Sequence, residues 1–321
     1  MRLVEAAEPI FARHETFHPR YGWFRKAYAS VGRDPGMFTR EDAPIQLGVG
    51  KNMVRAIRFW GTAAKLIKES PDSRPRRSAT MTRTHLGDRL FGEHGWDPYM
   101  EEPATLWLLH WLLLASPCHL PVWWLTFNEF NAVEFDDEQL EQVVHTQLQV
   151  AATWRMPHRS SIRKDVRALL RTYTPATPTA RVGIEDILDC PLRELRLIGR
   201  SEATGRYRFA AGAKPSLPAA VVTFAAMDYV DRTRPGIHTV SLGQLAQGSG
   251  GPGRAFRLTE GKLREALGSV AGESTLIELA SVAGASQLSW SGSPRETAFA
   301  VLDDYYGRSS DASRVTREVP A

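Results

Sequence analysis

The chain has 321 residues, enough for two or three domains with separate cores, and its hydrophobic and charged fractions of 43% and 24% are typical of a globular protein. The only cysteines, Cys118 and Cys190, exclude a disulfide framework and an all-cysteine zinc site. Glu5 and Glu8 stand where a signal peptide would be apolar, and the most apolar run, residues 106–115, is too short to span a bilayer. We therefore expect a reduced, cytoplasmic protein without a membrane segment.

The net charge of +4 conceals a segregated distribution of charged residues. Residues 1–90 contain 17 lysines and arginines against nine acidic residues, whereas residues 91–150 contain none against ten. Residues 151–181 are basic again, with seven against one, and the remainder is balanced. This segregation favours basic modules that bind a polyanion beside an acidic module with another task. Chance clustering on a large surface is the alternative.

Residues 1–80 are predicted to form a helix-turn-helix or winged-helix-like DNA-binding module. Two helices at residues 23–31 and 41–47 precede a longer helix within residues 47–68, which begins at a turn with two glycines. One face of the long helix is apolar and the opposite face is cationic, as a helix in the major groove of DNA requires. Asn52 is placed to meet a base edge. A solvated basic surface helix is the alternative. The predicted DNA contacts in this module are Arg20, Lys26, Lys51, Asn52, Arg55, Arg58 and Lys65.

Residues 81–180 are predicted to form an acidic, Trp-rich helical core followed by a basic helix. Residues 106–115 are apolar on all sides, so this helix must be buried. A helix at residues 137–154 follows, with acidic residues at its positive end. The basic helix, residues 157–173, is a second candidate for contact with DNA. The predicted core tryptophans are Trp107, Trp111, Trp123 and Trp124, and the predicted DNA contacts are Arg159, Arg163 and Lys164.

Residues 181–306 are predicted to form a second winged-helix-like module, in which Arg254 and Arg257 would contact DNA. Residues 307–321 are expected to be a disordered tail. The fold class is therefore mainly α with small β-hairpins (α+β), with winged-helix-like modules at both ends of a helical, Trp-rich middle region. The predicted elements of the second module are a strand pair at residues 195–198 and 207–209, helices at 217–232, 238–246 and 258–267, and wing strands at 275–280 and 285–290.

Nucleotide motifs are incomplete in this sequence. Residues 48–52, GVGKN, resemble a phosphate-binding loop, but Ile45 and Asn52 occupy the positions of the required glycine and hydroxyl residue. The glycine-rich residues 248–253 do not lie between a strand and a long helix, which a dinucleotide motif requires. We expect no nucleotide or redox cofactor.

The densest set of hard-metal ligands is Asp97, Glu101 and Glu102, with His110 further along. Cleavage of a phosphodiester requires carboxylates that hold Mg²⁺ or Mn²⁺, or a histidine that acts as a base. We therefore predict that Asp97, Glu101 and His110 are catalytic and that the three carboxylates bind metal. Alternatively, Asp97 caps a turn, the two glutamates precede a helix, and His110 is a core histidine.

Several stretches resemble the SspB family of bacterial single-stranded DNA phosphorothioation systems, in order from residue 11 to about residue 290. They include FARHETFHPRYGWFRKAY (11–28), DAPIQLGVGKNMVRAIRFW (42–60), GWDPYMEEPATLWLLHW (95–111) and GPGRAFRLTE (251–260). The resemblance implies a nickase of double-stranded DNA in antiphage defence. It also implies three partners: an SspA-like cysteine desulfurase, an SspC-like ATPase and an SspD-like reductase homologue. The alternatives are a non-catalytic sequence-specific DNA-binding subunit, a transcriptional regulator, or an adaptor without DNA contact.

Overall fold

The computed structural model describes residues 1–71, 79–151, 153–175, 190–282 and 284–317. These residues form two compact units. The larger unit contains residues 2–101 and 112–210, and the smaller unit contains residues 1, 102–111 and 211–321. The predicted boundaries at residues 80 and 180 both fall within the span of the larger unit. Helices and small antiparallel sheets make up both units, which agrees with the expected α+β class.

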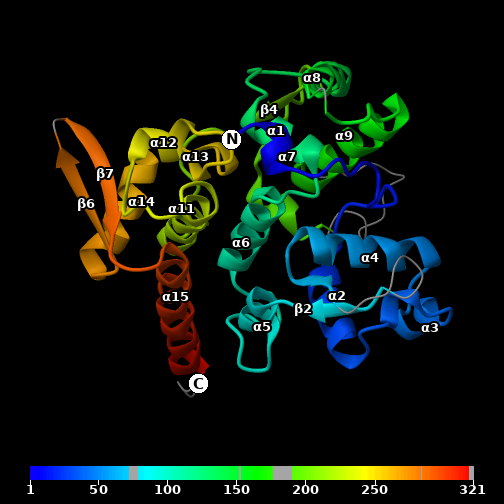
Figure 1. The fold of residues 1–321 in the computed structure, drawn as a ribbon, viewed down its shortest axis with the longest axis horizontal. Coiled ribbons are helices and arrows are strands. Elements are labelled where there is room, and N and C mark those ends of the chain that lie inside the picture. The colour runs from blue at the N-terminus through cyan, green and yellow to red at the C-terminus, as the bar shows by residue number, and fades with distance from the viewer. Residues whose placement is uncertain (72–78, 152, 176–189, 283, 318–321) are drawn as a thin grey trace. The chain divides into compact units, whose positions relative to one another are not determined.

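The N-terminal part of the larger unit is a set of helices followed by a hairpin (Figure 1). Its helices α2 and α4 cross closely because Gly61 has no side chain: a Cβ atom there would lie 2.5 Å from the Cβ of Ala27. The helix α4 ends earlier than predicted, because Lys65 has a left-handed φ of 60° and residue 67 begins a strand. The elements are α1 (Leu3–Ala6), α2 (Trp23–Arg33), η1 (Met37–Thr39), α3 (Ala43–Leu47), α4 (Lys51–Ala63), β1 (Ile67–Glu69) and β2 (Met81–Arg83).

The rest of the larger unit contains the Trp-rich core and the second basic helix. Trp123 and Trp124 are almost completely buried, which confirms that these predicted core tryptophans form core. Residues 72–78 and 176–189 lie outside the described residues. The elements are α5 (His85–Phe91), α7 (Pro121–Asn128), α8 (Asp137–Val150), α9 (Arg159–Tyr173), η2 (Pro191–Leu195), β3 (Ile198–Arg200) and β4 (Tyr207–Phe209).

The smaller unit is built on helices α11, α14 and α15 (Figure 1). It also contains a three-stranded sheet in the order β5-β7-β6. The helix α6 (Pro103–Leu114) contributes Trp107 and Trp111 to its core, as its apolar sequence predicts. The backbone remains helical to Arg317, past residue 307, where we expected a disordered tail to begin. The elements are α11 (Ala219–Thr233), β5 (Thr239–Ser241), α12 (Leu242–Gln247), α13 (Pro252–Ala255), α14 (Glu260–Glu273), β6 (Ile277–Val282), β7 (Ala285–Trp290) and α15 (Pro294–Arg317).

Within the described ranges, no helix combines the length and the apolar character needed to cross a bilayer.

Candidate nucleic-acid interface

The helix α4 presents cations to solvent from a short turn after α3. Gly48 ends α3 with a left-handed φ of 63°, and Gly50 is the N-cap of α4. Lys51, Asn52 and Arg55 are exposed in the first two turns, whereas the opposite face of the helix is buried in the core. The helix itself contains no acidic residue. This surface can therefore approach phosphates without repulsion from its own side chains.

Two carboxylates already contact the cationic face of α4. Arg55 Nη1 lies 3.6 Å from Glu15 Oε1, and Arg58 Nη2 donates a hydrogen bond of 2.8 Å to Glu69 Oε1. The arginines are 56% and 31% exposed, and ion pairs this exposed contribute less than about 1 kcal/mol each. A phosphate can compete for both arginines at this small energetic cost.

Three other predicted DNA contacts of this module have roles inside the fold. Lys26 Nζ donates to the carbonyl oxygen of Leu47 at 3.0 Å, at the C-terminal end of α3, where cations are favourable. Lys65 lies beyond the end of α4, and its Nζ donates to the carbonyl oxygen of Leu112 at 2.5 Å. The guanidinium of Arg20 packs over aromatic rings, and its Cζ lies 5.6 Å from the centroid of the Trp23 ring. These side chains stabilise the unit, and the exposed cationic surface is narrower than the sequence suggests.

The helix α9 carries the second group of exposed cations in the larger unit. Arg159, Arg163 and Lys164 are all exposed. Arg163 Nε donates to the carboxylate of Glu141 on α8 at 3.2 Å. This is a solvent-exposed ion pair like the one between Arg55 on α4 and Glu15. This helix therefore offers phosphates a second basic surface.

The predicted contacts in the smaller unit are less accessible. Arg254 Nε donates to the carbonyl oxygen of Gln247 at 3.2 Å. Arg257 is only partly exposed, and burial, together with the nearby charge of Arg254, lowers the pKa of Arg257 to about 10. On α14 itself, the cations alternate with exposed Glu260 and Glu265. The positive charge on this unit is consequently weaker than on α4.

The predicted catalytic residues are divided between the units. Asp97, which is 5% exposed, accepts a hydrogen bond of 2.9 Å from the backbone N–H of Glu101, so it caps the turn before α6. Both residues belong to the larger unit. In the smaller unit, Glu102 Oε1 accepts a hydrogen bond from Ser309 Oγ at 2.5 Å. His110 is completely buried there, and its Nε2 donates to the carbonyl oxygen of Ala255 at 2.9 Å.

The positions of these acidic residues and of His110 can be compared with what a divalent metal ion needs from its ligands. Among the described residues, no three histidine, cysteine, aspartate or glutamate side chains come together in a way that could hold a metal ion. Mg²⁺ often takes only one or two carboxylates and keeps several water ligands, so the assignment of Asp97, Glu101 and Glu102 as metal ligands stays a prediction, and we derive no catalytic step through a metal. Burial also lowers the pKa of His110 to about 4, as expected for a neutral core histidine.

A buried pair between distant residues escaped the sequence analysis. His14 and Asp165 are 1% and 2% exposed, and His14 Nε2 lies 2.6 Å from Asp165 Oδ1. Asp165 occupies the otherwise apolar face of α9, between Ile162 and Val166. A carboxylate at such a position signals a buried hydrogen-bond partner, but the partner's identity cannot be read from the helix alone.

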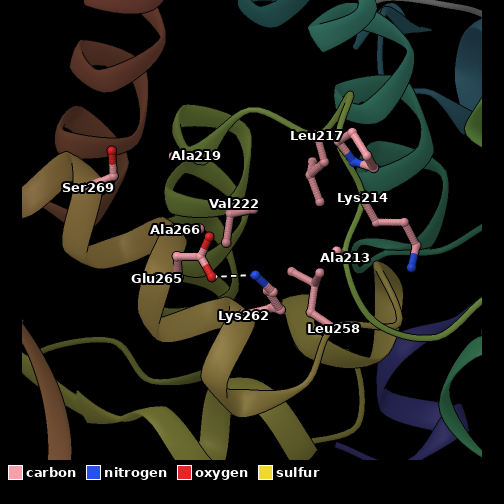
Figure 2. A pocket seen from close by; sticks show the side chains of 11 residues that line it. Ala213, Lys214, Leu217, Ala219, Val222, Leu258, Lys262, Glu265, Ala266 and Ser269 are labelled. Atoms are coloured by element: carbon pink, nitrogen blue, oxygen red, sulfur yellow. Dashed lines mark hydrogen bonds and ion pairs between the residues drawn. The ribbon is translucent and has the colours of Figure 1, made fainter.

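A small cavity in the smaller unit was also not predicted (Figure 2). Its volume is about 330 Å³, and Leu217, Val222 and Leu258 supply apolar lining. The charged lining residues interact within the protein. Lys262 forms an ion pair with Glu265, drawn as a dashed line in Figure 2, with Nζ 2.5 Å from Oε2. Lys214 Nζ donates to the carbonyl oxygen of Gly212 at 3.0 Å. Polar groups directed at a ligand, which binding sites usually contain, are therefore not evident among these side chains.

Comparison with known proteins identifies the family. The family described as a protein of unknown function, DUF4007, matches residues 11–306. A solved structure described as magnesium ion-bound SspB is 39% identical, with a TM-score of 0.89, and the match covers 95% of this chain and 90% of that one. A second SspB structure is also 39% identical, with a TM-score of 0.88 and coverage of 96% and 91%. Among curated proteins, none matches. This chain therefore belongs to the SspB family and, over residues 11–306, to the DUF4007 family.

Proposed function

We propose that this protein is the double-stranded DNA-binding component of a bacterial DNA phosphorothioation system, and that it nicks one strand. The observation that carries the proposal is the exposed cationic face of α4. Lys51 and Arg55 lie on one side of a helix whose other side is buried, and the helix has no acidic residue. Most contacts that hold proteins on DNA are made to phosphates, so such a face supplies affinity.

The connectivity supports a winged-helix interpretation at both ends of the chain. The order α2, α3, α4 and then the β1–β2 hairpin has a short turn before the third helix, as in helix-turn-helix domains. In the smaller unit, α11, β5, α12 and α14 precede the β6–β7 hairpin, and β5 pairs with β7. We interpret α4 as the recognition helix of the first module and α14 as the corresponding helix of the second.

The roles within α4 follow from side-chain chemistry. Lys51, Arg55 and Arg58 bind phosphate oxygens, and the amide of Asn52 can donate to and accept from one adenine edge in the major groove. The cations of α9 extend the phosphate contacts. Within the system, a cysteine desulfurase, an ATPase and a reductase homologue are the proposed partners, resembling SspA, SspC and SspD. Nicking would use Mg²⁺ or Mn²⁺, and the oxygen ligands would have to include groups beyond those that the described residues bring together.

DNA binding is tested by fluorescence anisotropy of a labelled duplex at several salt concentrations. Arg55→Ala should weaken binding and reduce the slope of log K against log [salt] by about one, because one phosphate contact is lost. Arg308→Ala removes an exposed arginine of α15 in the smaller unit and is the matched control. If both variants have the wild-type slope, α4 does not contact DNA.

Nicking is tested separately, with supercoiled plasmid and Mg²⁺ or Mn²⁺. Wild-type protein should produce open circles. Glu101→Gln should reduce their rate of formation, because a neutral amide replaces the carboxylate that would bind the metal, while the side chain keeps its size and shape. Asp97→Asn tests the other carboxylate of the larger unit. Open-circle formation at the wild-type rate in both variants would contradict the assignment of these carboxylates.

A second function, a DNA-recognition subunit without catalytic activity, is favoured by the placement of the acidic residues. Asp97 caps a turn, Glu102 bonds to Ser309, and His110 is buried, so each has a structural role. For this function, plasmid stays supercoiled with either metal, while duplex binding retains its dependence on Arg55. A transcriptional regulator would show the same two results together with selective binding to its operator.

A further inference from the structure

The loop of residues 11–17, here called the strap, is attached to the second basic helix by a buried polar contact. The imidazole Nε2–H of His14 donates to Asp165 Oδ1 on α9 at 2.6 Å, and the backbone N–H of Ala12 donates to the same oxygen at 2.9 Å. Ahead of α9, the ring of Trp154 packs edge-to-face against Phe11, with 6.4 Å between centroids. The strap therefore contacts α9 itself through polar groups and the segment just before α9 through apolar ones.

The same strap contacts α4. The His14 ring stacks on that of Trp60, with centroids 6.1 Å apart and an interplanar angle of 27°. Trp60 Nε1 donates to the carbonyl oxygen of Phe17 at 3.1 Å, and Glu15 approaches Arg55. One histidine side chain thus contacts both basic helices of the larger unit.

The backbone of the strap is held in an unfavourable conformation. Ala12, Glu15 and Thr16 have φ values of 54°, 52° and 67°, in the left-handed region that residues with a Cβ avoid, and a β-branched threonine avoids it most. Such conformations persist only where surrounding contacts impose them. The buried pair on one side and the tryptophan contacts on the other supply that constraint.

Asp165, together with the buried apolar residues of α9, sets which way the helix faces. It is buried, whereas its neighbour Lys164 is exposed, because successive helical residues point about 100° apart. A hydrogen bond that fixes Asp165 toward the strap therefore fixes the rotation of α9 and the direction of Lys164. The contacts of Trp60 fix α4 in the same way.

We propose that the strap is a positioning element that sets α4 and α9 at a fixed spacing and rotation, so that one DNA duplex is bound by both helices at once. His14 and Asp165 are positioning residues in this arrangement, since neither is exposed to DNA. The DNA part of the inference rests on the proposed function, whereas the spacing of the helices can be measured without DNA.

The spacing is measured by pulsed electron paramagnetic resonance, with spin labels at Lys51→Cys and Lys164→Cys. Both positions are exposed, and the native Cys118 and Cys190 are buried. The distance distribution should be narrow in the otherwise wild-type protein and should broaden in His14→Ala. Replacement by glutamine, His14→Gln, keeps an N–H donor for Asp165 and should restore the narrow distribution. Asp165→Leu removes the acceptor from the α9 side and should broaden the distribution in the same way, so it provides the test if the alanine variant fails to fold.

A control separates positioning from loss of stability. Leu148→Ala creates a cavity under α8 in the same unit without removing a strap residue, and it should lower stability while the distribution stays narrow. Broadening in Leu148→Ala equal to that in His14→Ala would overturn the proposal, as would a narrow distribution in both His14→Ala and Asp165→Leu.

The DNA role is tested by a double-mutant cycle on the salt slope, in unlabelled protein. Lys164→Ala should reduce the slope by about one in the wild-type background and have no effect in His14→Ala, where α9 no longer faces the same duplex as α4. An undiminished effect of Lys164→Ala in both backgrounds overturns the inference while DNA binding stands. If the wild-type protein binds no duplex, the proposed function fails and the DNA role of the strap fails with it, whatever the label distances show.

Discussion

Acidification should destabilise the smaller unit through His110. This side chain is fully buried, its Nε2 donates to the carbonyl oxygen of Ala255, and its ring contacts those of Trp107 and Phe256. Burial lowers its pKa from 6.5 to about 4, and the hydrogen bond to Ala255 only partly opposes this. The unfolded chain therefore takes up the proton at a higher pH than the folded chain does.

The expected loss of stability follows from this difference. Above pH about 6.5 the histidine is neutral in both states, so its contribution to stability is complete. As the pH falls toward 4, protonation favours the unfolded state, and the contribution is progressively lost. A tenfold difference in proton affinity corresponds to about 1.4 kcal/mol. With pKa values of 6.5 in the unfolded chain and about 4 in the folded chain, the free energy of unfolding falls by about 3 kcal/mol in full. About 2 kcal/mol of this has been lost by pH 5.

The assay is urea unfolding at pH 7 and pH 5, followed by tryptophan fluorescence, for wild type and His110→Gln. Glutamine offers an N–H to Ala255 without titrating, so the wild type should lose about 2 kcal/mol more than the variant over this interval. Burial also lowers the pKa of His18, to about 4, but both proteins contain this residue and its effect cancels in the comparison. Equal losses in the two proteins would refute the reasoning.

Other substitutions test the surface and the packing of the N-terminal module. Glu69→Gln removes the carboxylate beside Arg58 and should strengthen duplex binding by about 0.2–1 kcal/mol in anisotropy at low salt; weaker binding would contradict the competition between Glu69 and phosphate. Gly61→Ala places a Cβ against Ala27 and should lower the free energy of unfolding by about 1–3 kcal/mol, whereas an unchanged melting temperature would mean that α2 and α4 separate freely. Lys65→Met removes the hydrogen bond to the last turn of α6, so stability should fall by about 1–3 kcal/mol while the salt slope of DNA binding stays constant. A slope reduced by about one would instead place Lys65 on a phosphate.

Features that depend on neighbouring residues could be predicted from the sequence. The apolar residues on all sides of α6 require burial, and Trp107 and Trp111 are indeed core. The spacing of Lys51 and Arg55 against Ile57 defines the two faces of α4, because helical periodicity is a local property. The small hairpin at residues 277–290 was expected for the same reason, since short alternating runs flank a turn.

Tertiary packing decided which of the similar side chains meet solvent. Lys51 is exposed whereas Lys65 donates to a backbone carbonyl, although both belong to the same predicted stripe. The partner of Asp165 lies 151 residues away, at His14, and no local period relates the two. A basic, amphipathic helix and a core built from tryptophans were predictable from local pattern, because these features follow from periodicity and the burial of apolar surface. The end of that helix, the cations that remain exposed and the distant polar groups that pair could not be predicted in this way, because buried hydrogen bonds depend on the folding of the whole unit.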